Sequence, residues 1–159
     1  MSVSIRNLNI VIDGMPIVHD VDMDIADGER VGLIGSSGSG KSMIAKSIMG
    51  LLPLSAQVSG SIDMGGTEIV GASDQAIADL RGSYVGMVFQ NPDDQLVATL
   101  VEDDVAFGPE NLGVPSAQIA QRVREALKGV GLVGFERHET HALSGGQKQR
   151  VALAGVLAM

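Results

Sequence analysis

Two short glycine-rich stretches hold the residues whose types and spacing best suit chemistry. The first reads GSSGSGKS over residues 35–42 and fits the P-loop pattern G-x-x-x-x-G-K-[ST]. A phosphate group needs many N–H donors at close range, and glycine lets the main chain wrap around it without side-chain clash. The pattern predicts that a nucleoside triphosphate is bound by Gly35, Ser36, Ser37, Gly38, Ser39, Gly40, Lys41 and Ser42.

The residues around this stretch are those that a P-loop needs. An apolar strand is predicted over residues 30–35 (RVGLIG), and a helix over residues 41–52 that is ended by Gly50 and Pro53. The start of that helix adds N–H donors and the positive end of its dipole. Lys41 is then expected on the β- and γ-phosphates and the Ser42 hydroxyl on Mg²⁺. The alternative is a serine-rich turn before a helix, which the two flanking elements disfavour.

The second stretch reads LSGGQ over residues 143–147 and opens the last predicted helix. Ser144 is a good N-cap, and Gly145 and Gly146 leave the first-turn N–H groups open to an anion. Taken alone, such a glycine pair is better explained as structural capping. It gains meaning from the P-loop earlier in the same chain.

Together the two stretches resemble the ATP-binding subunits of ABC transporters, for which LSGGQ is the signature sequence. The resemblance runs from about residue 3 to the last residue. It implies that two ATPase chains sandwich two ATP molecules head to tail, each P-loop facing the partner's signature. The residues expected to bind the γ-phosphate in trans are Ser144, Gly145, Gly146 and Gln147.

A third stretch, VFQNPDDQLVATLVEDDVAFGPENLGVP over residues 88–115, adds to the resemblance. Gln90 matches the Q-loop glutamine of the family, which implies contact with Mg²⁺ together with Ser42. The continuation is most similar to the energy-coupling-factor and cobalt or nickel uptake branch, although the P-loop helix also resembles peptide-importer relatives. In that branch the Q-loop region docks transmembrane subunits, and the same is expected here.

Two groups of polar residues contain side chains that could bind a metal ion. The acidic residues between 93 and 104 are expected to form a solvated face, with a metal site as the alternative: Asp93, Asp94, Glu102, Asp103 and Asp104. His138 and His141 are three residues apart, which differs from the HExxH spacing, so a loop is favoured over a zinc site.

The remaining pattern predicts an α/β fold: a P-loop sheet core, an antiparallel β subdomain and part of an α-helical subdomain. Strands are expected over residues 3–12 and 17–25, a strand pair within residues 59–70, and a buried strand over residues 83–90. Helices are expected near residues 73–82, over residues 116–130 with a cap, and after residue 144. We expect one ABC-type nucleotide-binding domain over residues 1–159.

Composition limits the function. The formal net charge of −8 argues against nucleic-acid binding, and the absence of cysteine excludes disulfides. The N-terminus lacks the pattern of a secretory signal and no apolar run reaches the length of a membrane span. We expect a cytoplasmic chain, peripheral on the cytoplasmic face of the membrane.

Two features depart from the family pattern. No aromatic residue precedes Tyr84, so the adenine is expected to lie near residues 11–13 without ring stacking, and base selectivity is expected to be weak. The Walker B acid, the catalytic glutamate and the switch histidine follow the signature in the family, and none lies before Met159. The helix after Val151 is apolar on all sides, which is typical of a buried helix. We therefore expect the N-terminal part of a longer ATPase, truncated at its C-terminus.

The predicted function of the parent protein is ATP-driven membrane import by an ABC or energy-coupling-factor type ATPase. For the 159-residue chain itself we favour nucleotide binding without turnover, because no catalytic residue is expected within it. The alternatives are a soluble ABC-family ATPase unrelated to transport and a P-loop kinase, which the signature disfavours.

Overall fold

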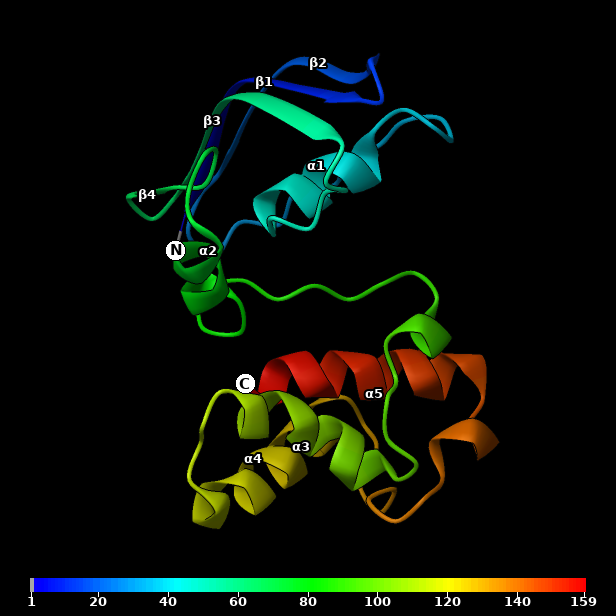
Figure 1. Ribbon diagram of the computed structural model, residues 1–159. Coiled ribbons are helices and arrows are strands. Elements are labelled where there is room, and N and C mark those ends of the chain that lie inside the picture. Colours follow the sequence, from blue (N-terminus) through cyan, green and yellow to red (C-terminus); the bar gives the residue numbers. More distant parts are fainter. Residues whose placement is uncertain (1) are drawn as a thin grey trace. The chain divides into compact units, whose positions relative to one another are not determined.

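The computed structural model describes residues 2–159, which form two compact units. The first unit ends at Tyr84 and the second begins at Val85. In the first unit, Figure 1 shows a sheet accompanied by helices, and in the second it shows a group of helices.

The first unit is built on a four-stranded antiparallel sheet in the order β2-β1-β3-β4. Its strands are β1 (Val3–Ile12), β2 (Met15–Ile25), β3 (Ala56–Met64) and β4 (Thr67–Glu68). Asp13 and Gly14, both with positive φ, form the two-residue turn between β1 and β2, as a hairpin of this length requires. The predicted N-terminal strands and the strand pair near residue 60 are confirmed.

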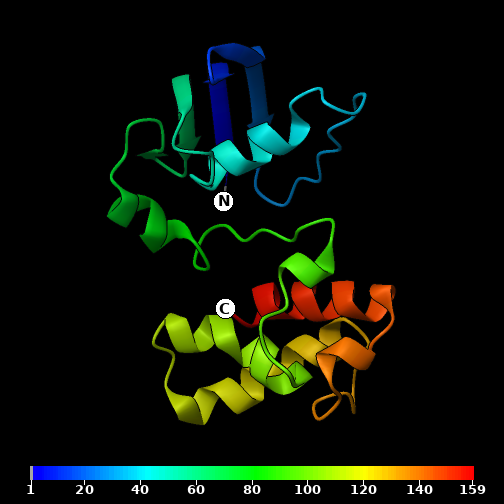
Figure 2. The same cartoon turned by 45° about the vertical axis from the view of Figure 1, so that its right-hand side comes forward.

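The core of the first unit lies on one face of the sheet. Alternate positions of β1 and β3 are buried there, namely Ile5, Leu8, Ile10, Ile62 and Met64. Helix α1 (Lys41–Ile48) contacts strand β2 and buries Ile44, and Figure 2 shows it beside the sheet. Helix α2 (Asp74–Leu80) follows, and the Ser73 hydroxyl oxygen caps it by accepting from the N–H of Ala76.

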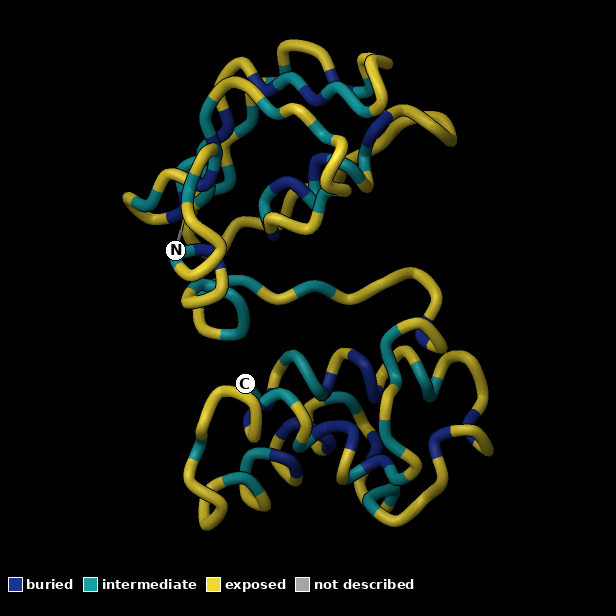
Figure 3. The backbone as a smooth tube through the Cα atoms, in the orientation of Figure 1, coloured by how far each residue is buried: buried dark blue, intermediate teal, exposed yellow. Residues whose placement is uncertain are grey.

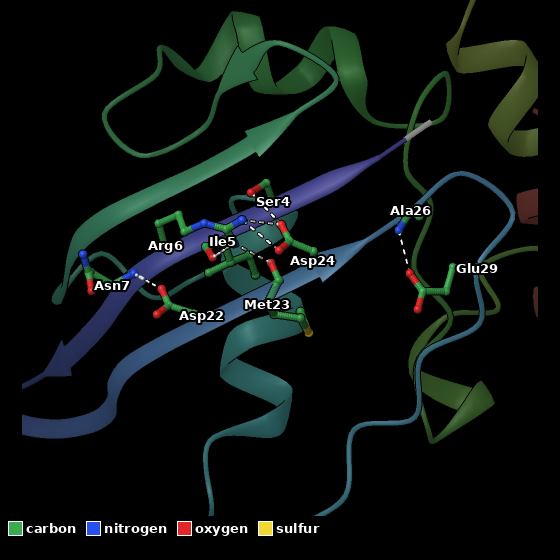
Figure 4. A network of polar contacts seen from close by, with 9 residues as sticks. All are labelled: Ser4, Ile5, Arg6, Asn7, Asp22, Met23, Asp24, Ala26 and Glu29. Carbon is green, nitrogen blue, oxygen red and sulfur yellow. Dashed lines mark hydrogen bonds and ion pairs between the residues drawn. The ribbon is translucent and has the colours of Figure 1, made fainter.

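Polar side chains join β1 to its neighbour β2, as Figure 4 shows. Both carboxylate oxygens of Asp24 lie 2.7 Å from Nη2 of Arg6, and the Ser4 hydroxyl donates to Asp24 at 2.9 Å. The hydrogen bond from Arg6 lowers the pKa of Asp24, and the same bond raises the pKa of Arg6. Asp22 accepts from the N–H of Asn7, whose φ of 47° marks an irregular point in the pairing. These contacts hold the register where the ladder is interrupted.

The second unit consists of three packed helices: α3 (Val101–Asn111), α4 (Ser116–Gly129) and α5 (Gly145–Ala158). Two single turns of 3₁₀ helix, η1 (Pro92–Asp94) and η2 (Thr140–Ala142), lie in the connections. The helices bury one apolar core, which includes Val101, Val105, Leu127, Leu132, Val151 and Ala154. Figure 3 shows buried stretches of backbone within this helical group. This core fixes α5, whose N-terminus carries the LSGGQ stretch.

Two predicted strands are absent from the part of the chain that the structure describes. Residues 30–35 are irregular, and Ile34 is 95% exposed. Residues 86–89 are also irregular, and Val88 and Phe89 are partly exposed. A strand needs a hydrogen-bonded neighbour, and the four-stranded sheet ends at β2 and β4 without pairing to either segment. The prediction of strand at these two places was therefore wrong for this structure.

The helical predictions need smaller corrections. Helix α1 is shorter than expected, since Met49 caps it before Gly50, whose φ is 61°. Helix α4 has the predicted span, but its N-cap is Pro115, which makes no side-chain capping bond. Helix α5 buries Val151 and Ala154, whereas Leu157 is 59% exposed, so it is not buried on all sides.

Candidate nucleotide-binding site

The P-loop stretch of residues 35–42 curls into the start of α1. Gly38 and Gly40 have φ of 81° and 84°, a conformation that L side chains rarely adopt. Gly40 is also the N-cap of α1, so the loop passes directly into the first helical turn. Gly38 and Gly40 are therefore required by the backbone path, and the first amides of the helix lack intrahelical acceptors.

Close packing against β2 gives Gly40 a second role. A Cβ at this position would lie 2.9 Å from Cγ2 of Val18 and 3.0 Å from the carbonyl oxygen of Ile17. The loop thus rests on the sheet, and any larger residue would push it away. A cavity of about 220 Å³ lies at this junction, lined by Ile17 and residues 38–43. Its position at a helix N-terminus suits an anion.

Lys41 points its ammonium group into the concave side of the loop. Nζ donates to the carbonyl oxygens of Gly35 at 2.8 Å and Ser36 at 2.7 Å, and to the hydroxyl of Ser39 at 3.2 Å. The loop is therefore closed around a positive charge that is held by neutral oxygen atoms alone. A phosphate oxygen is a stronger acceptor than these groups, because hydrogen bonds between ionised partners are about twice as strong as neutral ones.

The residues at the loop fit a magnesium ion bound through a phosphate. Ser42 is exposed in the first turn of α1 and its hydroxyl oxygen is a suitable hard ligand. Mg²⁺ keeps several waters and uses few protein ligands, so one hydroxyl beside a phosphate site is enough to place it. Gln90 lies in the second unit, and its role as a ligand stays a prediction. Within residues 2–159, no group of three or more His, Asp or Glu side chains is placed to hold a metal.

The LSGGQ stretch forms a capping box at the start of α5. The N–H of Gln147 donates to the Ser144 hydroxyl oxygen at 3.4 Å, and the N–H of Ser144 donates to Oε1 of Gln147 at 2.8 Å. These two residues thus cap each other. The Ser144 hydroxyl keeps its hydrogen for an outside acceptor, since its oxygen is the atom used in the cap.

Gly145 and Gly146 are the exposed first residues of α5. A Cβ on either would meet no atom within 4 Å, so neither glycine is required by packing. Their φ values are ordinary, so neither is required by the backbone path. Because neither residue has a side chain, an anion can approach the N–H groups at the positive end of α5 freely. This is the arrangement of an anion site.

Gln90 is exposed at the end of the irregular segment before η1. Its main-chain oxygen accepts from Nε2 of Gln149 at 3.4 Å, which places it beside α5. Lys148, also on α5, forms an ion pair with Asp93 at 2.5 Å. The structure thus brings the predicted Q-loop and the signature helix together within the second unit.

Asp104 departs from the solvated face expected for the acidic residues between 93 and 104, whereas Asp93, Asp94 and Asp103 are exposed. Asp104 is buried, and its Oδ1 accepts from the N–H groups of Val97 at 2.7 Å and Ala98 at 3.0 Å. The Thr140 hydroxyl donates to the carbonyl oxygen of Ala98 at 2.7 Å. Asp104 and Thr140 therefore hold the loop between η1 and α3 from both sides. The solvated-face prediction was wrong for Asp104, because it neglected the unpaired amides of this loop.

The two histidines predicted to lie in a loop serve separate contacts. The His138 ring stacks on Phe135 with centroids 4.5 Å apart, and Nε2 of His141 lies 3.2 Å from Glu139. His138 lies in irregular structure and His141 within η2.

No helix among residues 2–159 is both long and apolar enough to cross a membrane.

Comparison with known proteins gives one family. The family model described as ABC transporter matches residues 18–159. The energy-coupling factor transporter ATP-binding protein EcfA1 of Enterococcus faecalis is 50% identical over 147 residues, which cover 92% of this chain and 50% of the relative. Its counterpart EcfA of Methanothermobacter thermautotrophicus is 45% identical over 147 residues, covering 92% and 46%.

A solved structure agrees with these relatives. CbiO1 from Clostridium perfringens, described as part of the ABC transporter complex CbiONQ, superimposes with a TM-score of 0.85 at 39% identity. The match covers 98% of this chain and 61% of that one. This confirms the predicted P-loop ATPase fold and the predicted branch. The chain spans about half the length of the curated relatives it matches.

Proposed function

We propose, from the premise that this chain belongs to the ABC transporter family, that it is the nucleotide-binding part of an ATPase that powers membrane import of the energy-coupling-factor type. The observation that carries the proposal is the P-loop geometry. Lys41 and the first amides of α1 converge on one concave loop. The named relatives are ATP-binding proteins of energy-coupling factor transporters, which supports this branch over a soluble ATPase unrelated to transport.

The residues of the loop bind and orient the triphosphate. Lys41 exchanges its contacts with Gly35 and Ser36 for phosphate oxygens, and the amides of residues 38–42 neutralise the charge that remains. The gain is electrostatic, because a charged phosphate oxygen is a stronger acceptor for the Lys41 ammonium than the two carbonyl oxygens that it replaces. Binding then depends on backbone shape and on one side-chain cation.

Magnesium joins the site through the Ser42 hydroxyl, with Gln90 as the second predicted ligand. When bound, Mg²⁺ neutralises phosphate charge and orients the terminal phosphoryl group. Ser42 follows Lys41 in the first turn of α1. Ser42 would therefore hold the metal, and Lys41 would hold the phosphates.

The signature turn serves a second chain. Gly145 and Gly146 present their N–H groups, and the Ser144 hydroxyl presents its hydrogen, to the γ-phosphate held by the P-loop of a partner copy. Gln147 keeps the turn in shape through the capping box. This requires head-to-tail association that depends on nucleotide. Transmembrane subunits would dock near residues 88–97, which places the chain at the cytoplasmic face of a membrane.

Light scattering tests the association directly. Mg·ATP is added to the wild-type chain, to Gly145→Asp and to the control Gln118→Asp, in which the same charge is placed on an exposed site of α4. Wild type and the control should move toward dimer. Gly145→Asp should stay monomeric, because its carboxylate would face the γ-phosphate. Equal association of all three chains would contradict the in-trans role of the signature turn.

A further inference from the structure

The segment from Phe89 to Gln95 is attached to helix α5 through one side-chain amide. The N–H of Phe89 donates to Oε1 of Gln95 at 3.0 Å, and Nε2 of Gln95 donates to the carbonyl oxygen of Ala152 at 3.4 Å. Gln95 therefore joins two main-chain groups that lie 63 residues apart in the sequence (152 − 89). We call this pair of hydrogen bonds the Gln95 bridge.

The Gln95 bridge differs from the other contacts between the same two elements. The Asp93–Lys148 pair and the contact of Gln149 with the Gln90 carbonyl oxygen each extend from a side chain of α5 to a single group of the segment. Gln95 is half-buried and uses its donor and its acceptor at once. An amide is the group suited to this task, since it carries both functions in one plane.

Helix α5 is itself firmly placed. Val151 and Ala154 belong to the apolar core that it shares with α3 and α4. The capping box joins Ser144 of the signature turn to Gln147 in the first turn of α5. A segment that is hydrogen-bonded to the main chain at Ala152 is therefore held to the same helix as the signature turn. Figures 1 and 2 both show the turn at η1 lying next to α5.

We propose that Gln95 is a positioning residue that holds Gln90 at a fixed place relative to the Ser144–Gly146 turn of the same chain. It does so by joining the main chain on one side of Gln90 to α5. A displacement of Gln90 that follows nucleotide binding then moves the signature turn with it. The inference rests on the proposed function, because this positioning has a consequence only if both elements act on nucleotide.

Paired spin labels test the bridge. The chain has no cysteine, so labels attach only where cysteines are introduced. One pair joins Asp94→Cys to Leu157→Cys, and a control pair joins Gln118→Cys to Leu157→Cys, all at exposed positions. Each pair is measured in wild type, in Gln95→Met, which keeps the length but loses both hydrogen bonds, and in Gln95→Glu, which keeps only the acceptor.

The expected result is a broadened distance distribution for the first pair in Gln95→Met, at least about twice the wild-type width. Gln95→Glu should be intermediate, and the control pair should be unchanged in both. An unchanged first pair would overturn the proposal. If Gln95→Met also broadens the distance distribution of the control pair, that variant has lost its fold, and the result with Gln95→Glu decides. A broadened distribution for the first pair in Gln95→Glu supports the bridge, and an unchanged one overturns it.

A nucleotide titration separates positioning from mere structure. In wild type, Mg·ATP should shift the amide signals of the P-loop and also those of Gly145 and Gly146, at a concentration where the chain is monomeric. Gln95→Met should keep the P-loop shifts and lose those of the signature turn. Equal signature shifts in both chains, or none in wild type, would overturn the proposal. If the P-loop signals of the wild type do not shift, the proposed function is contradicted. The spin-label distances would then still test the Gln95 bridge.

Discussion

The Nζ atom of Lys41 lies 2.8 Å from the carbonyl oxygen of Gly35, across the mouth of the P-loop. Together with the contact to Ser36, this bond holds the loop closed around the ammonium group. The same atom is therefore both the internal brace of the loop and the proposed ligand for phosphate. Removing it should affect both properties.

Lys41→Ala should weaken Mg·ATP binding by about 10- to 150-fold or more, because hydrogen bonds to charged groups contribute about 1.5–3 kcal/mol each. Lys41→Arg keeps the charge but places it on a wider, planar group, and should damage binding less than Lys41→Ala. Calorimetric titration measures both. Lys46→Ala, which removes a charge from the last turn of the same helix, is the control and should bind like wild type. An unchanged affinity in Lys41→Ala would end the P-loop assignment.

Base selectivity should be weak. Residues 11–13 lie at the end of β1 and the start of the turn that follows it. No aromatic residue precedes Tyr84 in the sequence. Stacking of a base on an aromatic ring contributes about 1–3 kcal/mol, so its absence removes the usual source of adenine preference. ATP and GTP should bind within about tenfold of each other, which corresponds to about 1.4 kcal/mol. Competition between the two nucleotides measures the ratio, and a hundredfold preference for ATP would mean that another group reads the base.

Gly60→Ala should destabilise the first unit strongly. Gly60 has a φ of 100°, and a Cβ there would lie 2.4 Å from the carbonyl oxygen of Asn7, a main-chain atom that cannot turn away. We expect a loss of at least about 3 kcal/mol, the sum of backbone strain and displacement of β1. Urea unfolding of the chain measures it.

The matched control for this change is Gly66→Ala. Gly66 has a similar φ of 93°, but a Cβ there would meet nothing within 4 Å. Only the strain of a left-handed residue remains, about 1–2 kcal/mol. Equal losses in the two variants would show that the close approach of β3 to Asn7 is not a constraint on the fold.

The β3–β4 hairpin should be sensitive to acid through Glu68. Burial acts to raise the pKa of this carboxyl, but hydrogen bonds from the Ser61 hydroxyl and from the N–H groups of Ile62 and Val70 outweigh it and lower the pKa. A group with a lowered folded pKa stabilises the protein fully above its unfolded pKa and loses that contribution as pH falls through the folded value. Stability should therefore decline below about pH 4.5, the ordinary range of Glu.

Glu68→Gln isolates this contribution. The amide keeps an acceptor for Ile62 and Val70 but does not titrate, so the variant should be less stable than wild type at neutral pH and approach it in acid. Thermal unfolding at a series of pH values compares the two chains. Parallel curves down to about pH 3 would contradict the assigned role of the Glu68 carboxylate.

Local patterns predicted local structure well. The series Gly35 to Ser42 specified the P-loop because its glycines are needed at particular backbone angles, and Ser144 with Gln147 three residues later specified the capping box. The strands of the first unit followed from their alternation. In each case the deciding interactions lie within a few residues.

Features that depend on distant partners could not be read in the same way. The apolar residues 30–35 look like a strand, but strand formation needs a neighbour that the described residues do not provide. Helix α3 was not predicted: it contains Pro109, and its apolar side is matched by residues of α4 and α5, with which it forms the core. The Gln95 bridge and the Asp104 contacts join main-chain groups, which leave no trace in side-chain pattern.

The most direct test of the central claim follows the amide signals of the whole chain as Mg·ATP is added. We expect the largest shifts on residues 35–43, which share the loop and the first turn of α1, and we expect these shifts to saturate together. In Lys41→Ala the same titration should give shifts only at far higher nucleotide concentration. Saturating shifts centred elsewhere in the chain, with residues 35–43 unmoved, would contradict the claim that this loop holds the nucleotide.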